Sequence, residues 1–222
     1  MALAGTLTHD VDPVAAALLP SPVPPWLARL QFWLGLVLAA PVAGRGEEID
    51  DLVMARARRG DHQAFGEIVG CYDERLRALA YRLLDDRDRM DDVLQEAYVK
   101  AYRWLPQFKG TSALGTWLYR ITYNACMDEL RRPSRAVLAG EDDVDRPSLE
   151  PGPGEVAVQR CSLAAALKTL PADQRAAVLL VDAEGLDYAA AADVLGVRAG
   201  TVASRLSRAR AVLRRALEVD GA

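Results

Sequence analysis

The sequence predicts an all-α protein made of two small helical domains that are joined by a flexible acidic linker. Three observations predict this architecture. The composition favours helices, because Ala, Leu and Arg are abundant while Thr and Ile are scarce. Apolar residues recur at intervals of three and four over most of residues 47–132 and again over 158–219. Between these parts, residues 133–157 are rich in Pro, Gly and acidic residues, a composition that builds no packed core.

Residues 1–46 differ in composition from the rest of the chain. Several prolines interrupt them, and an apolar run over 26–40 follows that is shorter than the roughly 20 residues of a membrane-spanning helix. A signal peptide is an alternative, but the residues before the run include His9, Asp10 and Asp12 instead of basic charge. Docking on a partner or a membrane and a start codon placed too far upstream are further alternatives. We expect this N-terminal extension to be disordered or to precede the working protein.

Four helices are expected in the domain over residues 47–132. They cover 48–59, a long stretch that Asp61 caps, 88–105 and 116–132, and Gly60, Pro106 and Pro133 end three of them. Helical spacing predicts which positions face the core. These are Phe65, Ile68, Val69, Tyr72, Leu76, Leu79, Ala80, Leu83, Leu94, Ala97, Ala101, Trp104, Leu105, Leu118, Ile121, Ala125 and Leu130.

The domain over residues 158–219 ends in a predicted helix-turn-helix. A helix ending near Leu170 and a second over 172–183 come first. Asp187 then caps a short helix that Gly196 ends, and the last helix starts near Gly200. Up to Arg215, one side of that helix is apolar and the other is basic, with no acidic residue, so it fits a DNA major groove. A solvated basic surface is the alternative. The two sides carry Val202, Leu206, Ala209 and Leu213, and Arg198, Arg205, Arg208, Arg210, Arg214 and Arg215.

Charge and reactive residues exclude several classes of function. The formal net charge is −4, so any attraction to nucleic acid must come from local basic clusters. Cys71, Cys126 and Cys161 are odd in number and far apart, which favours reduced thiols over disulfides or a zinc site. His9 and His62 lie beside no nucleophile and carboxylate at a catalytic spacing. We therefore expect no catalytic residue, metal, cofactor or small-molecule substrate.

Aromatic and basic residues alternate around the loop over residues 107–115. This pattern is typical of proteins that bind single-stranded nucleic acid, where rings stack on unpaired bases. We assign Trp104 and Trp117 chiefly to packing. The residues expected to contact DNA are Phe108, Lys109, Tyr119, Arg120, Tyr123, Asn124, Arg131 and Arg132.

Three blocks of the sequence together resemble RNA polymerase sigma factors of the extracytoplasmic-function (ECF) group of the sigma-70 family. They are DDVLQE over 91–96, TWLYRI over 116–121 and GTVASRLSRAR over 200–210. The resemblance covers nearly all of residues 48–217. It implies that 47–132 is region 2, which binds core polymerase, recognises the −10 element and helps melt DNA, and that 158–219 is region 4, which recognises the −35 element.

The resemblance also implies partners and site residues. Region 2 would dock on the clamp helices of the largest polymerase subunit and region 4 on the β flap. The docking residues are Asp91, Asp92, Val93, Leu94, Gln95 and Glu96. The −35 residues are Arg198, Thr201, Ser204, Arg205, Arg208 and Arg210.

Two positions depart from the pattern of the family. Ala203 stands where relatives commonly carry Lys or Arg, and 189–192 lack the usual glutamate. The resemblance further implies a non-enzymatic cytoplasmic protein that an anti-sigma factor controls, held at the membrane where that inhibitor is membrane-bound. From the residues alone, a stand-alone helix-turn-helix regulator is the alternative function.

Overall fold

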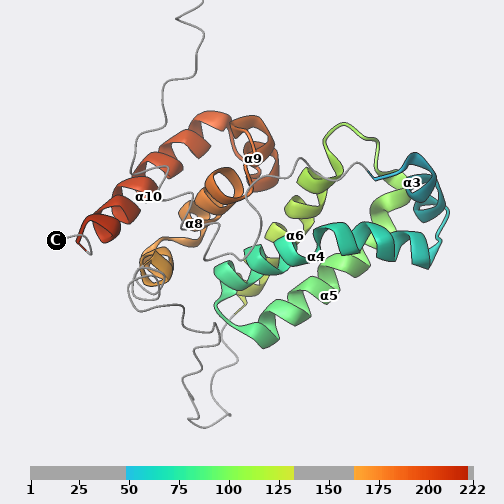
Figure 1. Cartoon of the computed structure of the whole chain (residues 1–222), viewed down its shortest axis with the longest axis horizontal. Coiled ribbons are helices and arrows are strands. Elements are labelled where there is room, and N and C mark those ends of the chain that lie inside the picture. The colour runs from blue at the N-terminus through green and yellow to red at the C-terminus, as the bar shows by residue number, and fades with distance from the viewer. Residues whose placement is uncertain (1–48, 133–162, 220–222) are drawn as a thin grey trace, which may run out of the picture.

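The structure is a computed structural model that describes residues 49–132 and 163–219. Every regular element in these two segments is helical, which confirms the all-α prediction (Figure 1). The predicted N-terminal extension and the predicted linker lie outside the described residues, as does Cys161. Of the described cysteines, Cys71 is half-buried and its Sγ donates to the carbonyl oxygen of Glu67 at 3.2 Å, while Cys126 is buried.

Three helices of the first described segment begin after a capping aspartate. Asp61 occupies the predicted capping position and accepts hydrogen bonds from the backbone N–H groups of Gln63 at 2.9 Å and Ala64 at 3.1 Å. Asp86 caps the next helix, directly after Asp85 has ended the preceding one with a left-handed φ of 56°. These elements are α3 (Asp51–Arg58), α4 (His62–Leu84), α5 (Arg87–Trp104), the 3-10 turn η1 (Leu105–Gln107) and α6 (Leu114–Arg131).

Most predicted core positions of this segment are buried, but two are at the surface. Trp104 is 50% exposed and Leu130 is 36% exposed, so their assignment to the core is wrong. The inward position at the end of α5 is taken by Leu105, which is fully buried. In the last turn of α6 it is taken by Glu129, whose carboxylate lies 3.0 Å from Nε of Arg89. A half-buried ion pair therefore replaces the expected apolar contact.

The second described segment contains a wide helical turn ahead of the helix-turn-helix. Residues 163–169 are helical, and Pro171 precedes the next helix. The five residues that directly follow that helix form a π-helix. This π-helix turns the side chain of Asp182 into the core, where the residue is only 3% exposed. Asp187 caps the following helix through a 2.7 Å bond from Ala190 N, and Gly196 ends it, as predicted. The elements are α8 (Ala172–Val178), η2 (Leu179–Ala183), α9 (Tyr188–Leu195) and α10 (Ala199–Val219).

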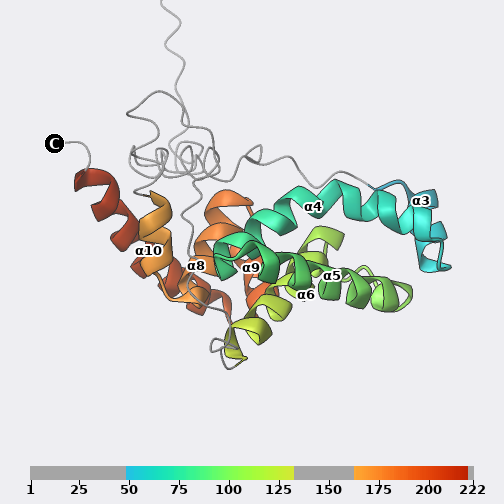
Figure 2. The ribbon, with the colours of Figure 1, turned by 90° about the horizontal axis from the view of Figure 1, so that it is seen from below.

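The two segments pack against each other. α6 lies against α9, and the end of α4 meets α8 (Figures 1 and 2). Arg175 of α8 donates from Nη1 to the carbonyl oxygen of Arg82 at 2.8 Å, near the end of α4. Lys168 pairs with Asp85 at 2.8 Å. The buried residues of both segments thus form one continuous apolar cluster.

The described residues contain neither a membrane-spanning helix nor a cluster of metal ligands. No helix within 49–132 or 163–219 has both the length and the apolar character needed to cross a membrane. In the same residues, no group of three or more His, Cys, Asp or Glu side chains is placed to hold a metal ion.

Candidate nucleic-acid interface

The residues predicted to contact −10 DNA comprise an exposed group, a buried pair and the half-buried Phe108. Tyr119 and Tyr123 of α6 are 4% and 7% exposed. The exposed group lies on the outer side of α6 and on the loop that precedes it. Its members are Lys109, Arg120, Asn124, Arg131 and Arg132.

Tyr119 of α6 forms a hydrogen bond with the C-terminal domain. Its hydroxyl donates a short hydrogen bond to the carboxylate of Glu184, which lies just after η2. Burial raises the pKa of Tyr119 far above its ordinary value, and the charge of Glu184 raises it further. Burial also raises the pKa of Glu184. Sequence reasoning missed this contact because no local pattern links residues 65 positions apart.

Phe108 is anchored to the first helix of the domain. Arg58 of α3 donates from Nη2 to the carbonyl oxygen of Phe108 at 2.8 Å, and its guanidinium lies 5.9 Å from the centroid of the Phe108 ring. The same ring packs on Trp117, with 5.1 Å between the centroids. Half-buried Trp117 thus has the packing role predicted for it. Lys109, the next residue, is exposed on the loop that Arg58 fixes.

The predicted polymerase-binding block lies on α5, with its apolar residues inward. Val93 and Leu94 are 4% and 1% exposed, so they hold α5 in the core. The outward residues are Asp91, Asp92, Gln95 and Glu96.

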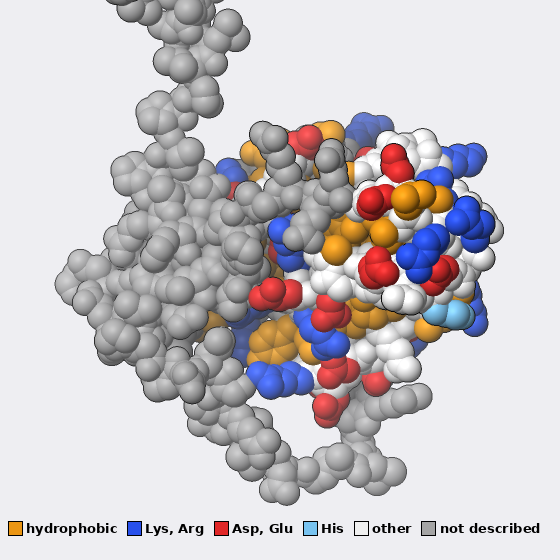
Figure 3. Space-filling model, turned by 45° about the vertical axis from the view of Figure 1, so that its right-hand side comes forward, with side chains coloured by type: hydrophobic (Ala, Val, Ile, Leu, Met, Phe, Trp, Pro, Cys, Tyr) orange, Lys and Arg blue, Asp and Glu red, His pale blue; other side chains and the backbone are white. Residues whose placement is uncertain are grey.

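Two of these outward carboxylates are already paired. Nη1 of Arg77 lies 2.5 Å from Asp91. Glu96 pairs with Lys100 at 2.7 Å, and the hydrogen bond from Lys100 lowers the pKa of Glu96. Acidic and basic side chains accordingly intermingle over the part of the surface that Figure 3 shows uncovered.

The residues predicted to contact −35 DNA also have different environments. Arg198, Thr201, Ser204 and Arg208 are exposed at and after the start of α10. Ser204 donates to the carbonyl oxygen of Thr201 at 2.9 Å. These four positions leave the start of α10 polar and accessible.

Arg205 and Arg210 instead form ion pairs within their own domain. Arg205 lies 2.9 Å from Asp173 of α8. Arg210 binds the buried carboxylate of Asp182 through both Nε, at 3.0 Å, and Nη2, at 2.5 Å. This bidentate bond raises the pKa of Arg210. Sequence reasoning identified both arginines as cations but not the aspartates that hold them.

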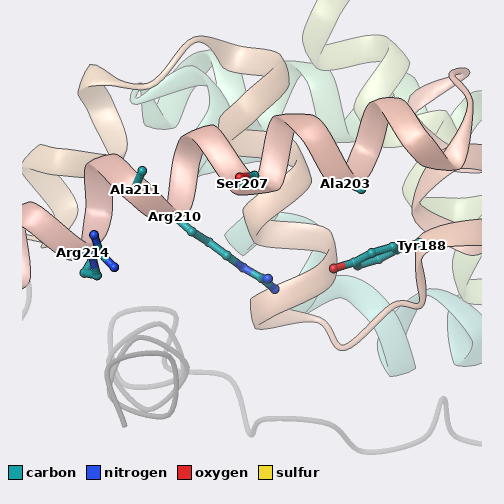
Figure 4. A pocket seen from close by; sticks show the side chains of 6 residues that line it. All are labelled: Tyr188, Ala203, Ser207, Arg210, Ala211 and Arg214. Atoms are coloured by element: carbon teal, nitrogen blue, oxygen red, sulfur yellow. The ribbon is translucent and has the colours of Figure 1, made fainter. Parts of the chain in front are cut away.

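An open groove runs beside α10. It has a volume of about 410 Å³, and Arg210 crosses it toward Tyr188 (Figure 4). Ala203, Ser207 and Ala211 line its α10 wall. Tyr188 and Ser207 were not predicted from the sequence, although Tyr188 directly follows the capping Asp187 and thereby starts α9. The remaining lining residue is Arg214.

Comparison with known proteins identifies both domains. A family model described as Sigma-70 region 2 matches residues 68–136, and one described as Sigma-70, region 4 matches 162–213. The ECF RNA polymerase sigma factor SigM of Mycobacterium tuberculosis is 38% identical over 186 residues, which are 83% of this chain and 92% of the relative. The chain belongs to the ECF group of sigma-70 family RNA polymerase sigma factors. It therefore directs transcription initiation and is not an enzyme, which decides against a stand-alone regulator.

Further relatives agree with this membership. RNA polymerase sigma-H factor of Pseudomonas aeruginosa is 36% identical over 187 residues, which cover 78% of this chain and 95% of the relative. The sigma factor RpoE of Bartonella quintana, solved in complex with the anti-sigma factor NepR, is similar in structure with a TM-score of 0.57 and 30% identity. That match covers 71% of this chain and 99% of the solved one, so it includes both helical domains of this sigma factor.

Proposed function

We propose that this sigma factor recognises the −35 element with the exposed side of α10. The observation that carries the proposal is Arg208, which is exposed and forms no ion pair with any residue that the structure describes. A free guanidinium on the second helix of a helix-turn-helix can bind a phosphate or a guanine edge. Arg198, Thr201 and Ser204 add donors at the same end of α10. Arg210, bound to Asp182, orients the helix instead.

We further propose that α6 and the loop over 107–115 hold the unpaired strand of the −10 element. Lys109, Arg120 and Asn124 are the exposed polar side chains that support this role, with Arg131 and Arg132 beyond them. Stacking of a base on an aromatic ring contributes about 1–3 kcal/mol, enough to offset the cost of unpairing it. Phe108 is the half-buried ring on this loop.

The acidic side of α5 is the proposed contact with the clamp helices of the largest polymerase subunit. Asp92, Gln95 and Glu96 face outward, while Val93 and Leu94 fix the helix from below. Charge complementarity with a basic partner helix would speed encounter and set the register. Region 4 would contact the β flap.

Control by an anti-sigma factor is part of the proposal. Its support is the family and the solved complex of the Bartonella sigma factor with NepR. The proposed location is the cytoplasm, at the membrane where the anti-sigma factor is membrane-bound.

Run-off transcription with purified core polymerase on genomic fragments tests the proposal. Arg208→Ala should reduce −35-dependent transcription by roughly 5- to 150-fold, the equivalent of about 1–3 kcal/mol, with holoenzyme assembly unchanged. Arg215→Ala, which removes the same charge further along α10, is the matched control. Equal transcription by wild type and Arg208→Ala would overturn the −35 assignment. In a binding assay with purified core polymerase, Asp92→Asn with Glu96→Gln should weaken core binding, and unchanged binding would overturn the α5 assignment.

A further inference from the structure

Arg58, the last residue of α3, makes two contacts with a single residue of the loop over 107–115. Its Nη2 donates to the carbonyl oxygen of Phe108 at 2.8 Å. Its guanidinium also lies 5.9 Å from the centroid of the Phe108 ring, a distance at which a cation is attracted to an aromatic face. Because one contact holds the backbone and the other holds the ring, Phe108 is fixed in both position and orientation.

Phe108 extends this anchor to the helices on both sides of the loop. Its ring packs on that of Trp117, in the first turn of α6, with 5.1 Å between the centroids. Its backbone N–H donates to the carbonyl oxygen of Leu105 in η1 at 3.1 Å. Arg58 therefore holds the point at which the chain leaves η1 and enters the loop.

The residues after Phe108 depend on this point. Lys109 is exposed, and Gly110 turns the chain with a left-handed φ of 70°, which glycine adopts without strain. Residues 111–113 then form bends until α6 begins at Leu114. The direction in which the chain carries Lys109 is therefore set by the backbone of Phe108, which Arg58 holds.

The end of α3 is itself fixed to the rest of the domain. Directly after Arg58 the chain turns at Gly60, whose carbonyl oxygen accepts a hydrogen bond from the hydroxyl of Tyr102 on α5 at 2.8 Å. Nε of Arg56 donates to the carboxylate of Asp61 at 2.8 Å, which closes the turn between α3 and α4. α3 also contacts η1. Arg58 thus reaches the loop from a defined position.

We infer that Arg58 is a positioning residue for promoter melting. Through Phe108 it holds the loop over 107–115 in the arrangement that presents Lys109 to the unpaired −10 strand. α3 thereby takes part in −10 recognition without contacting DNA, although it lies outside the elements that carry the proposed contacts. The inference rests on the proposed −10 function, but the hold of Arg58 on the loop can be measured without DNA.

Cleavage of the full chain by trypsin after Lys109, read by mass spectrometry, measures how firmly the loop is held. Local opening of a folded segment limits such cleavage. Arg58→Ala removes both contacts with Phe108 and should speed cleavage after Lys109 by about threefold or more, relative to cleavage after Arg131 at the end of α6. Arg59→Ala removes the same charge from the next exposed position and should leave the ratio unchanged.

Two outcomes of the cleavage experiment would overturn the inference. One is an unchanged ratio in Arg58→Ala, which would mean that the contacts with Phe108 do not hold the loop. The other is an equal increase in Arg59→Ala, which would mean that the loss of a charge anywhere at the end of α3 is sufficient. Circular dichroism should show both variants folded, because residues 58 and 59 are exposed.

Permanganate reactivity of thymines in the −10 region measures promoter melting by the holoenzyme, on a promoter found by run-off transcription. Arg58→Ala should lower this reactivity by about threefold or more with holoenzyme assembly unchanged, while Arg59→Ala should not. Arg58→Lys keeps a donor for the carbonyl oxygen of Phe108 and should restore about half of the wild-type signal or more. A rescue of this kind is not expected from a residue that only supports the fold.

Lys109→Ala in the same permanganate assay separates this inference from the proposed function. Reduced melting by Lys109→Ala together with normal melting by Arg58→Ala would uphold the −10 contact and overturn the inference. Normal melting by Lys109→Ala would overturn the proposed role of Lys109, while the cleavage ratio still decides whether Arg58 holds the loop.

Discussion

Replacing Asp182 with asparagine should destabilise the C-terminal domain by about 3 kcal/mol. The Asp182 side chain is 1% exposed and holds Arg210 through two hydrogen bonds, of 2.5 and 3.0 Å. Removing one partner of such a pair leaves the other charge buried and typically costs about 3–5 kcal/mol. The lower figure applies because the Arg210 side chain is 21% exposed and water can reach part of the guanidinium.

Urea unfolding followed by circular dichroism measures this loss. With a slope of roughly 2 kcal/mol per molar urea, the midpoint should fall by about 1.5 M. Asp193→Asn, an exposed substitution on α9, should change stability by less than about 0.5 kcal/mol. Combining Asp182→Leu with Arg210→Met removes both charges and should recover most of the loss. A loss below about 1 kcal/mol for Asp182→Asn, or a double variant as unstable as the single one, would refute the reasoning that the loss comes from a buried charge left without its partner.

Two further predictions concern the N-terminal domain. Gly115→Ala should destabilise it by about 1–3 kcal/mol in urea unfolding, because a Cβ there would lie 2.9 Å from the buried ring of Tyr72. Gly66→Ala, with nothing within 4 Å, should instead stabilise α4 by about 0.5–1 kcal/mol, and equal effects would contradict this reasoning. Bonds from the backbone and from Arg56 lower the pKa of Asp61 below 3.8, so its stabilising effect is present above that pH and is lost as the pH falls through the lowered value. Asp61→Asn should therefore melt below the wild type at pH 7, with a gap that closes in strong acid; a gap independent of pH would exclude the charge as its cause.

Local signals in the sequence predicted most of the secondary structure. A helix cap involves only the side chain of the capping aspartate and the backbone N–H groups of the next few residues. The capping roles of Asp61 and Asp187 could therefore be predicted from the local sequence. Gly196 likewise ends α9 because the residue there has a φ of 64°, which glycine adopts without strain. The apolar side of α10 followed from spacing alone, and all four of its predicted residues are buried.

Partners distant in the sequence explain what could not be predicted. The local sequence around a basic residue on a helix looks the same whether its side chain faces DNA or a buried carboxylate. Arg205 and Arg210 therefore could not be distinguished from Arg208 until Asp173 and Asp182 were placed beside them. The environment of Tyr119 also could not be predicted, because its hydroxyl binds Glu184 in the other domain. Helical spacing placed both Trp104 and Leu105 toward the core, but only Leu105 is buried, because spacing alone does not resolve which of two adjacent residues at a helix end faces inward.

If α10 binds the −35 element as proposed, the groove beside it offers positions at which the promoter preference of this protein can be changed. Its wall contains Ala203 and Ala211, whose methyl groups leave a volume of about 410 Å³ free next to the helix. Longer side chains introduced at these two positions could extend into that space, while Val202 and Leu206 stay buried in the core. Selection from a library randomised at the two alanines would therefore test whether side chains in this groove change the choice of promoter.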